Sequence, residues 1–235
     1  MNQTLINILK SREDISDYVF HFTKHADARK VLEQILADHA IKDIHNNGYI
    51  CFSEAPITML PDMFKIFEQY NDPMYAPYGI GIKKEDLFKI GGRPVIYSTY
   101  DEIQDFNNKF NTMSWRCVEY VPNVNDYSWL REWRAPSRGV DLYAIPFIVV
   151  AKTSKEINEL CYELDDIVVD GDVEEGCTEF LGYAEGKFKR EYFGISFDDI
   201  IQANGMSKQE LTQFLDSQHV GDEDDRFLGS IHNYI

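Results

Sequence analysis

The stretch from Asp126 to Arg134 constrains the fold of this chain most, because it is rich in aromatic residues and bounded by turn-forming ones. Aromatic residues favour strands, so it predicts a short strand that ends before Pro136. Side chains alternate along a strand, which places Leu130, Glu132 and Arg134 on one face and Trp129, Arg131 and Trp133 on the other. The Glu132 carboxylate is thus close to the Arg134 guanidinium. The two either form a surface ion pair, or the carboxylate orients a substrate hydroxyl or stabilises a developing cation.

The composition is typical of a packed globular protein. Of 235 residues, 44% are hydrophobic and 14% aromatic, which fits one large domain or a main domain with a small appendage. The sequence has neither a long apolar window nor a basic start followed by an apolar run, so we expect a soluble cytoplasmic protein. The cysteines are scattered, which supports neither a disulfide framework nor a zinc site. Cys51, in an apolar segment, is expected to be a small core residue.

The formal net charge of −17 argues against binding nucleic acid by broad phosphate neutralisation. It leaves room for a local basic cleft, since cations cluster at Lys83, Lys84, Lys89 and Arg93 and again at Arg131, Arg134 and Arg138. The acidic residues are concentrated late, in 163–175 and 222–225, and we expect them to be mainly solvated surface.

The hydrophobic pattern alternates between strand-like and helical segments, which predicts an α+β domain. The expected strands are 17–23, 49–52, 78–82, 94–97 and one or two within 140–150. The expected helices are a short one within 1–17, then 27–38, 57–70, 101–111 and 154–164, with an acidic loop over 165–176. In 78–82, two glycines within a strand indicate close approach of another backbone or of a ligand.

Residues 195–211 predict two short helices, with Ser196 and Ser207 as N-caps and Asn204-Gly205 as the turn between them. A helix-turn-helix motif would need cations at the start of its second helix, and only Lys208 is there. We therefore interpret this segment mainly as a helical module for packing or for a protein partner.

Five segments together resemble the AbiGi-like abortive-infection proteins and, more distantly, the ADP-ribosyltransferase fold of DarT-type toxins and poly-ADP-ribose polymerases. They are Val19-Phe20-His21-Phe22-Thr23, the run from Tyr49 to Pro56, the run from Tyr78 to Lys84, Pro94-Val95-Ile96-Tyr97 and Leu130-Arg131-Glu132-Trp133-Arg134. The resemblance covers roughly residues 18–138. It implies a split β-sheet core flanked by helices over 1–140, followed by a small α/β or helical extension over 141–235.

The resemblance also implies a site that uses NAD as a substrate and needs no metal. His21, with Thr23 beside it, matches the residue that holds the nicotinamide ribose, and Phe52 and Ser53 match those that line the nicotinamide. Glu132 matches the catalytic glutamate, which contacts the ribose 2′-hydroxyl and stabilises the oxocarbenium-like transition state. Tyr78 is a candidate for the stacking tyrosine, and Arg134 for support of the site.

One departure from the family concerns the acceptor. Members that modify arginine carry Glu two residues before the catalytic Glu, and Leu130 stands there instead. Nucleic acid, another protein side chain or plain NAD cleavage remain open, and an antitoxin or other protein partner is possible. The expected function is a toxin or effector in anti-phage defence, away from membranes. The alternatives are an inactive scaffold that binds a protein partner or senses phage, and an unrelated nuclease-like or nucleotide-binding domain.

Overall fold

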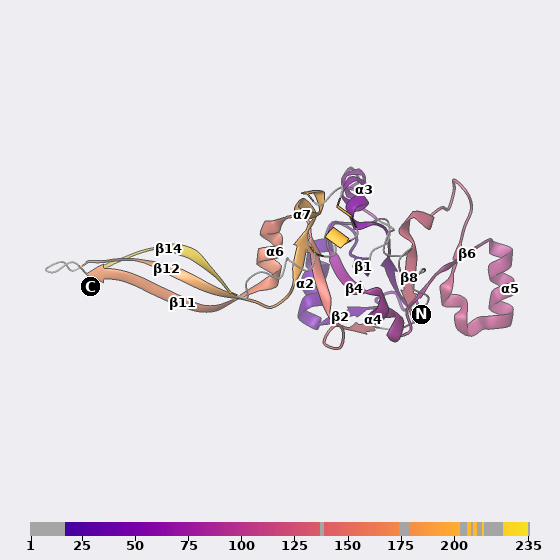
Figure 1. Cartoon of the computed structure of the whole chain (residues 1–235), viewed down its shortest axis with the longest axis horizontal. Helices are drawn as coiled ribbons and strands as arrows, with labels where there is room; N and C mark the ends of the chain where they lie inside the picture. The colour runs from indigo at the N-terminus through magenta and orange to yellow at the C-terminus, as the bar shows by residue number, and fades with distance from the viewer. Residues whose placement is uncertain are drawn as a thin grey trace.

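The computed structural model describes residues 17–136, 139–173, 179–202, 206–207, 209–210, 213 and 223–234. It shows a body built on one large sheet, a small lobe at one end and a long three-stranded arm at the other (Figure 1). The mixture of strands and helices is that of the α+β class. The described residues include no helix that is both long and apolar enough to cross a membrane.

The large sheet has seven strands in the order β13-β10-β4-β1-β3-β8-β5. They are β1 (Tyr18–Phe22), β3 (Ile50–Ser53), β4 (Gly79–Lys83), β5 (Arg93–Pro94), β8 (Glu132–Ala135), β10 (Phe147–Ala151) and β13 (Gly194–Ser196). All neighbours are antiparallel except β10 and β13, which are parallel. Since β10 and β13 come from the expected extension, the predicted domain boundary at residue 140 falls within this sheet.

The helices cover both faces of the sheet. On one face, α2 (Ala28–Asp38) buries Leu32, Ile35 and Leu36 against β1, β3 and β4. On the other, η1 (Ile57–Met59), α3 (Leu60–Phe67) and α7 (Phe197–Gln202) pack on Phe20 and Phe22. The remaining helices of the body are α4 (Lys84–Lys89) and α6 (Ser154–Cys161), and α6 begins with a Thr153–Glu156 capping box. Beside the large sheet, β2 (Ala40–Lys42) pairs with β9 (Gly139–Asp141).

The two glycines of β4 let the neighbouring strands approach closely. A Cβ atom at Gly79 would collide with the backbone carbonyl of His21, and one at Gly81 would lie 2.7 Å from the Phe20 ring. Of the two explanations for this glycine pair, the close approach of another backbone holds for Gly79.

The lobe is inserted between β5 and β8. It contains β6 (Ile96–Ser98), α5 (Tyr100–Phe110), η2 (Asn111–Arg116) and β7 (Cys117–Glu119), with β6 and β7 in parallel. It ends in a single turn of 3-10 helix, η3 (Ser128–Leu130), immediately before β8.

The predicted single strand over 126–134 is therefore wrong in its first half. The Asp126 carboxylate accepts hydrogen bonds from the backbone N–H and the hydroxyl of Ser128 at 3.0 and 2.5 Å, which favours a turn over an extended chain. Arg131 then takes a left-handed conformation (φ 46°), and the strand starts only at Glu132. Leu130 is buried in the turn rather than placed on the strand face with Glu132 and Arg134.

The arm contains β11 (Tyr162–Val173), β12 (Glu179–Arg190) and β14 (Glu223–Tyr234), all antiparallel in the order β11-β12-β14. The expected acidic loop over 165–176 is thus a strand up to Val173, because it pairs along its length with β12. The expected helix over 154–164 ends at Cys161, where β11 begins.

The predicted helical module starts as expected, since Ser196 caps α7 by accepting from the Asp199 N–H at 3.1 Å. The Ser207 hydroxyl likewise accepts from the Glu210 N–H at 3.3 Å. Asn204-Gly205 and the expected helix within 1–17 lie outside the described residues, apart from Asp17 at the start of the first strand.

Candidate functional site

Three of the segments that carry the family resemblance lie on neighbouring strands. In the sheet, β3 lies between β1, which carries His21, and β8, which carries Glu132. Ser53 pairs in register with Phe20 on one side and with Glu132 on the other. Strands that are far apart in the sequence therefore bring the predicted residues to one region.

Glu132 and Arg134 form the charged centre of this region. Arg134 donates from Nε to Glu132 Oε1 at 2.6 Å, and each side chain is only 11% exposed. The same guanidinium donates from Nη1 to the carbonyls of Trp115 and Cys117, and it lies 4.2 Å from the centre of the Tyr49 ring. The lobe thus fixes Arg134, and Arg134 fixes the carboxylate.

Cys51 connects Glu132 to His21. The His21 Nδ1–H donates to the Cys51 carbonyl at 2.8 Å, and the Cys51 thiol hydrogen-bonds the Glu132 carboxylate. Burial lowers the pKa of His21, so the ring is neutral at pH 7 and its Nε2 is an acceptor. The expected core position of Cys51 is wrong: the residue is exposed, and register places its side chain on the sheet face of Glu132 and Arg134.

Sequence reasoning missed two residues near the carboxylate, Tyr75 and Lys24. Burial, followed by the negative charge of Glu132, raises the pKa of the Tyr75 hydroxyl. The Tyr75 ring packs edge-on against Trp129 at 6.1 Å, and Lys24 Nζ lies 5.9 Å from its centre. Tyr75 stands in a loop between two prolines. An aromatic residue in such a loop could have indicated a binding position, but nothing in the local sequence relates Tyr75 to Glu132.

Four predicted residues have structural partners instead. The Thr23 hydroxyl donates to the Tyr78 carbonyl at 3.0 Å, and the Ser53 hydroxyl donates to the Leu130 carbonyl at 2.7 Å. Phe52 is 2% exposed in the core, with its ring edge-on to His21. The Tyr78 hydroxyl donates to Glu156 of α6 at 2.8 Å, so Tyr78 is engaged away from the Glu132 region. The structure therefore brings Glu132 and Arg134 together, and it uses Thr23, Phe52 and Ser53 as framework. Strand alternation and register place the His21 side chain on the other face of the sheet, beside Phe52, so His21 is linked to Glu132 only through Cys51.

This arrangement suits electrostatic stabilisation. A carboxylate held in place by Arg134 can stabilise positive charge that develops next to it without first reorganising. The neutral His21 Nε2 can accept a hydrogen bond from a sugar hydroxyl. The aromatic rings of Tyr75 and Trp129 offer faces for a planar group.

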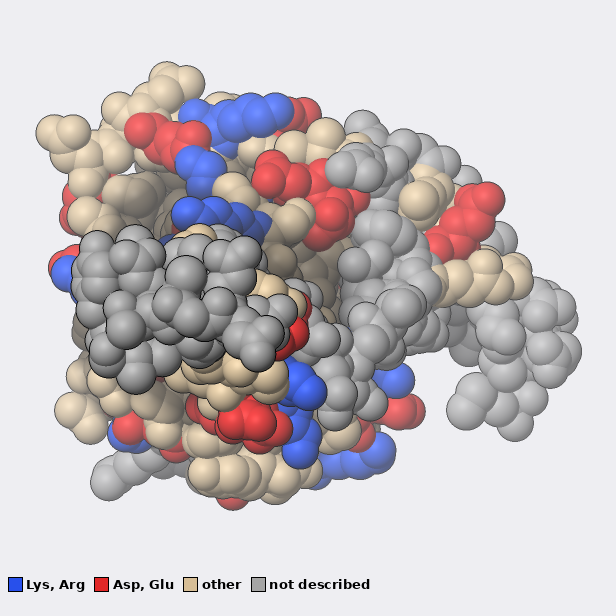
Figure 2. All heavy atoms as spheres, turned by 90° about the vertical axis from the view of Figure 1, so that its left-hand side faces the viewer, with Lys and Arg blue, Asp and Glu red and all other residues tan. Residues whose placement is uncertain are grey.

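Two cations of the expected basic cluster at Lys83, Lys84, Lys89 and Arg93 are paired with carboxylates. Lys84 Nζ donates to Glu54 Oε1 at 2.7 Å, and Lys89 pairs with Asp86 at 2.7 Å. Arg93 lies over the Phe88 ring at 3.7 Å. On the face seen along the arm, basic and acidic side chains lie side by side (Figure 2).

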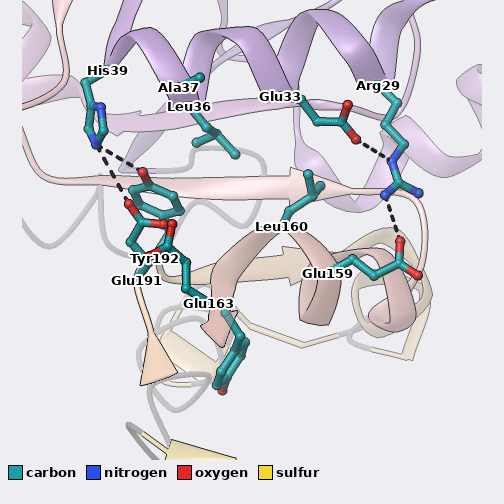
Figure 3. Close-up of a pocket in the computed structure, with 11 residues that line it drawn as sticks. Arg29, Glu33, Leu36, Ala37, His39, Glu159, Leu160, Glu163, Glu191 and Tyr192 are labelled. Atoms are coloured by element: carbon teal, nitrogen blue, oxygen red, sulfur yellow. Dashed lines mark hydrogen bonds and ion pairs between the residues drawn. The ribbon is translucent and has the colours of Figure 1, made fainter. Parts of the chain in front are cut away.

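A separate cavity of about 500 Å³ lies between α2, α6 and the base of the arm (Figure 3). Arg29 lies at one end and pairs with Glu33 and Glu159 at 3.0 and 2.7 Å. At the other end the Glu163 and Glu191 carboxylates share a hydrogen bond, which raises the pKa of Glu163. None of the residues implied by the family resemblance lines this cavity. Arg29 joins α2 to α6, and His39 at the end of α2 lies 3.9 Å from Glu191, just after β12.

Within the described residues, no three His, Cys, Asp or Glu side chains are grouped so that they could hold a metal ion. No protein-family model, curated protein or solved structure matches this chain. The motifs and the geometry around Glu132 are therefore the observations that bear on function.

Proposed function

We propose that this chain is an NAD-dependent ADP-ribosyltransferase with Glu132 as its catalytic residue, acting as a toxin or effector in bacterial anti-phage defence. The observation that carries the proposal is the Glu132 carboxylate, fixed by Arg134 and linked through Cys51 to His21 on the same sheet. The proposal includes the fold, a split-sheet ADP-ribosyltransferase core. It also includes the location of the protein, which is the cytoplasm, where NAD is available.

In the proposed reaction, the bond between the nicotinamide nitrogen and ribose C1′ breaks, and nicotinamide leaves with the electron pair as a neutral molecule. Positive charge develops on C1′ and the ring oxygen, and the Glu132 carboxylate stabilises it. A nucleophilic atom of the acceptor then forms the new bond to C1′ and loses its proton to solvent. The Glu132 carboxylate also accepts from the ribose 2′-hydroxyl and orients the sugar. Tyr75, rather than Tyr78, stacks on the nicotinamide.

The test uses labelled NAD with wild type, Glu132→Gln and Glu119→Gln, in which the last removes an exposed carboxylate of the lobe. Nicotinamide release is measured together with label on the protein, RNA and DNA of a lysate. We expect release by wild type and Glu119→Gln and a loss of at least about 100-fold in Glu132→Gln. The enzymatic proposal would be contradicted if wild type releases no nicotinamide when lysate protein, RNA and DNA and a phage lysate are all supplied.

A second candidate is an inactive scaffold of the same architecture that binds a protein partner, such as an antitoxin, or senses phage. The occupied hydroxyl groups of Thr23, Ser53 and Tyr78 favour it, because these groups already have partners within the protein. The scaffold predicts that NAD leaves the melting temperature unchanged in wild type and Glu132→Gln alike. The enzyme predicts that NAD raises the melting temperature of both and that only wild type cleaves it.

A further inference from the structure

The arm has one apolar and one polar face, and both are open to solvent. The apolar arm face is defined by Leu164, Ile167 and Val169 of β11, Phe188 of β12 and Leu228 of β14. The register places Leu164 opposite Phe188, and Ile167 and Val169 opposite Gly186 and Ala184. Leu164, Ile167, Val169 and Leu228 are 48, 51, 53 and 46% exposed, although they are apolar. No helix or second sheet covers the described arm in Figure 1.

The contacts across the strands show that this face is continuous. A Cβ atom at Gly186 would lie 2.9 to 3.1 Å from the side chains of Phe188, Leu164 and Leu228, which therefore gather over its bare backbone. Arg226 lies on the same face, with its guanidinium 4.2 Å from the Phe188 ring centre and 5.3 Å from that of Tyr162. At the base of the face, the cation therefore lies over aromatic rings.

The opposite face carries two acid–lysine pairs across β11 and β12. Glu163 is opposite Lys189, and Asp166 is opposite Lys187. The Tyr183 hydroxyl donates to Asp170 at 3.3 Å. Opposite charges directly across a strand pair stabilise a sheet and leave that face suited to water. An antiparallel sheet with one apolar and one polar face normally buries the apolar face.

We propose that the apolar arm face is a dimer interface, in which the arms of two copies of this chain pack face to face. Twelve residues at about 3.4 Å each and three strands at about 4.8 Å give a face of roughly 40 by 14 Å, or about 550 Å² per copy. Two such faces bury about 1,100 Å², which reaches the roughly 1,000 Å² that a specific interface needs.

The chemistry of the face favours a second copy over a charged partner. A twofold interface brings the same surface patch to both sides, so it must be self-complementary, as an apolar face is. The acidic residues of β11 that pair with lysines project from the other face, and they stay in water when the apolar faces meet. The chain charge of −17 nevertheless repels a second copy at long range. Salt screens that repulsion, so association through the apolar face strengthens as salt is added.

The test is sedimentation velocity of the full chain over about 1 to 100 µM protein at about 50 and about 500 mM salt. The variants are Ile167→Lys and Leu228→Lys on the apolar face, with Val168→Lys as the matched control on the opposite face of the same strand. We expect a wild-type dimer that is tighter at high salt. We expect each apolar-face variant to weaken dimerisation by roughly 100-fold, because in a twofold interface each substitution buries one lysine from each copy. We expect Val168→Lys to leave the dimerisation constant unchanged.

Several outcomes would overturn the proposal. They are a wild-type monomer throughout the series, a dimer that dissociates as salt rises, and equal weakening by Val168→Lys and Ile167→Lys. A monomer that binds a basic protein at low salt would assign the arm to a partner of opposite charge instead. Circular dichroism and the melting temperature of each variant check that the body is folded. Leu228→Lys, on another strand of the same face, separates loss of the interface from local disruption of β11.

Discussion

Arg134 and Glu132 lie two residues apart on β8, and the guanidinium donates from Nε to the carboxylate at 2.6 Å in a nearly buried pair. Strand alternation puts both side chains on one face, while the lobe supplies two backbone carbonyls that hold the guanidinium. The pair therefore connects the large sheet to the lobe, and it presents a fixed carboxylate beside Cys51 and Tyr75.

Removing one partner of this pair should destabilise the protein strongly. Arg134→Gln leaves the nearly buried Glu132 carboxylate without its cation, so we expect a loss of about 3 kcal/mol in the free energy of unfolding. Urea denaturation measures it. The control is Lys65→Gln, which breaks a pair with Asp62 whose side chains are 64 and 85% exposed and should cost less than about 1 kcal/mol. Equal losses in the two variants would mean that the Glu132–Arg134 pair contributes no more than a surface one.

Gly79→Ala should destabilise the sheet, because the new methyl group would collide with the His21 carbonyl and the Phe22 ring. Backbone cannot move aside as a flexible side chain can, so we expect a loss of at least about 2 kcal/mol. The control is Gly139→Ala in β9, where the nearest atom to the added Cβ is the Ile41 carbonyl oxygen at 3.4 Å. That variant should stay within about 0.5 kcal/mol of wild type, again by urea denaturation. A Gly79→Ala protein as stable as Gly139→Ala would contradict the close approach of β1 and β4.

Stability should fall as the pH drops below about 6.5, in part because of His21. Burial lowers the pKa of the folded-state ring, whereas the unfolded chain takes up the proton near the ordinary value of 6.5. Between the two values the unfolded state binds more protons, so acid favours unfolding there. Between about pH 7.5 and about pH 5.5, wild type should lose roughly 1 kcal/mol more than His21→Gln. Identical pH profiles for the two proteins would show that the folded state does not suppress protonation of His21.

Cys51 should react slowly with iodoacetamide although part of the residue reaches solvent. Burial of the thiol and the charge of Glu132 raise its pKa to about 12, and only the thiolate reacts quickly. Glu132→Gln removes that negative charge and leaves Arg134 nearby, so alkylation of Cys51 should become about tenfold faster at neutral pH. Mass spectrometry of the labelled peptides measures the rate, with the buried Cys161 as internal control. An unchanged Cys51 rate in Glu132→Gln would contradict the thiol–carboxylate contact.

Local pattern was sufficient for much of the body. The spacing of Leu32, Ile35 and Leu36 predicted α2, and the apolar runs predicted β1, β3, β4 and the strands within 140–150. The same reasoning failed over 165–176, where acidic residues favoured a loop. Pairing with β12 made this segment a strand up to Val173, where the described part ends, and that pairing depends on contacts that no local pattern contains.

The sequence by itself determined that Glu132 and Arg134 share one strand face, because alternation depends only on the backbone. It also determined that glycine stands at positions 79 and 81, where side chains would collide. Only the tertiary structure decided that the Cys51 thiol reaches Glu132 while the Cys51 carbonyl holds His21, that Tyr75 rather than Tyr78 lies near the carboxylate, and that an apolar arm face is left open. These relationships join residues tens of positions apart, and the strand order that brings them together follows from burial of the whole sheet rather than from any one segment.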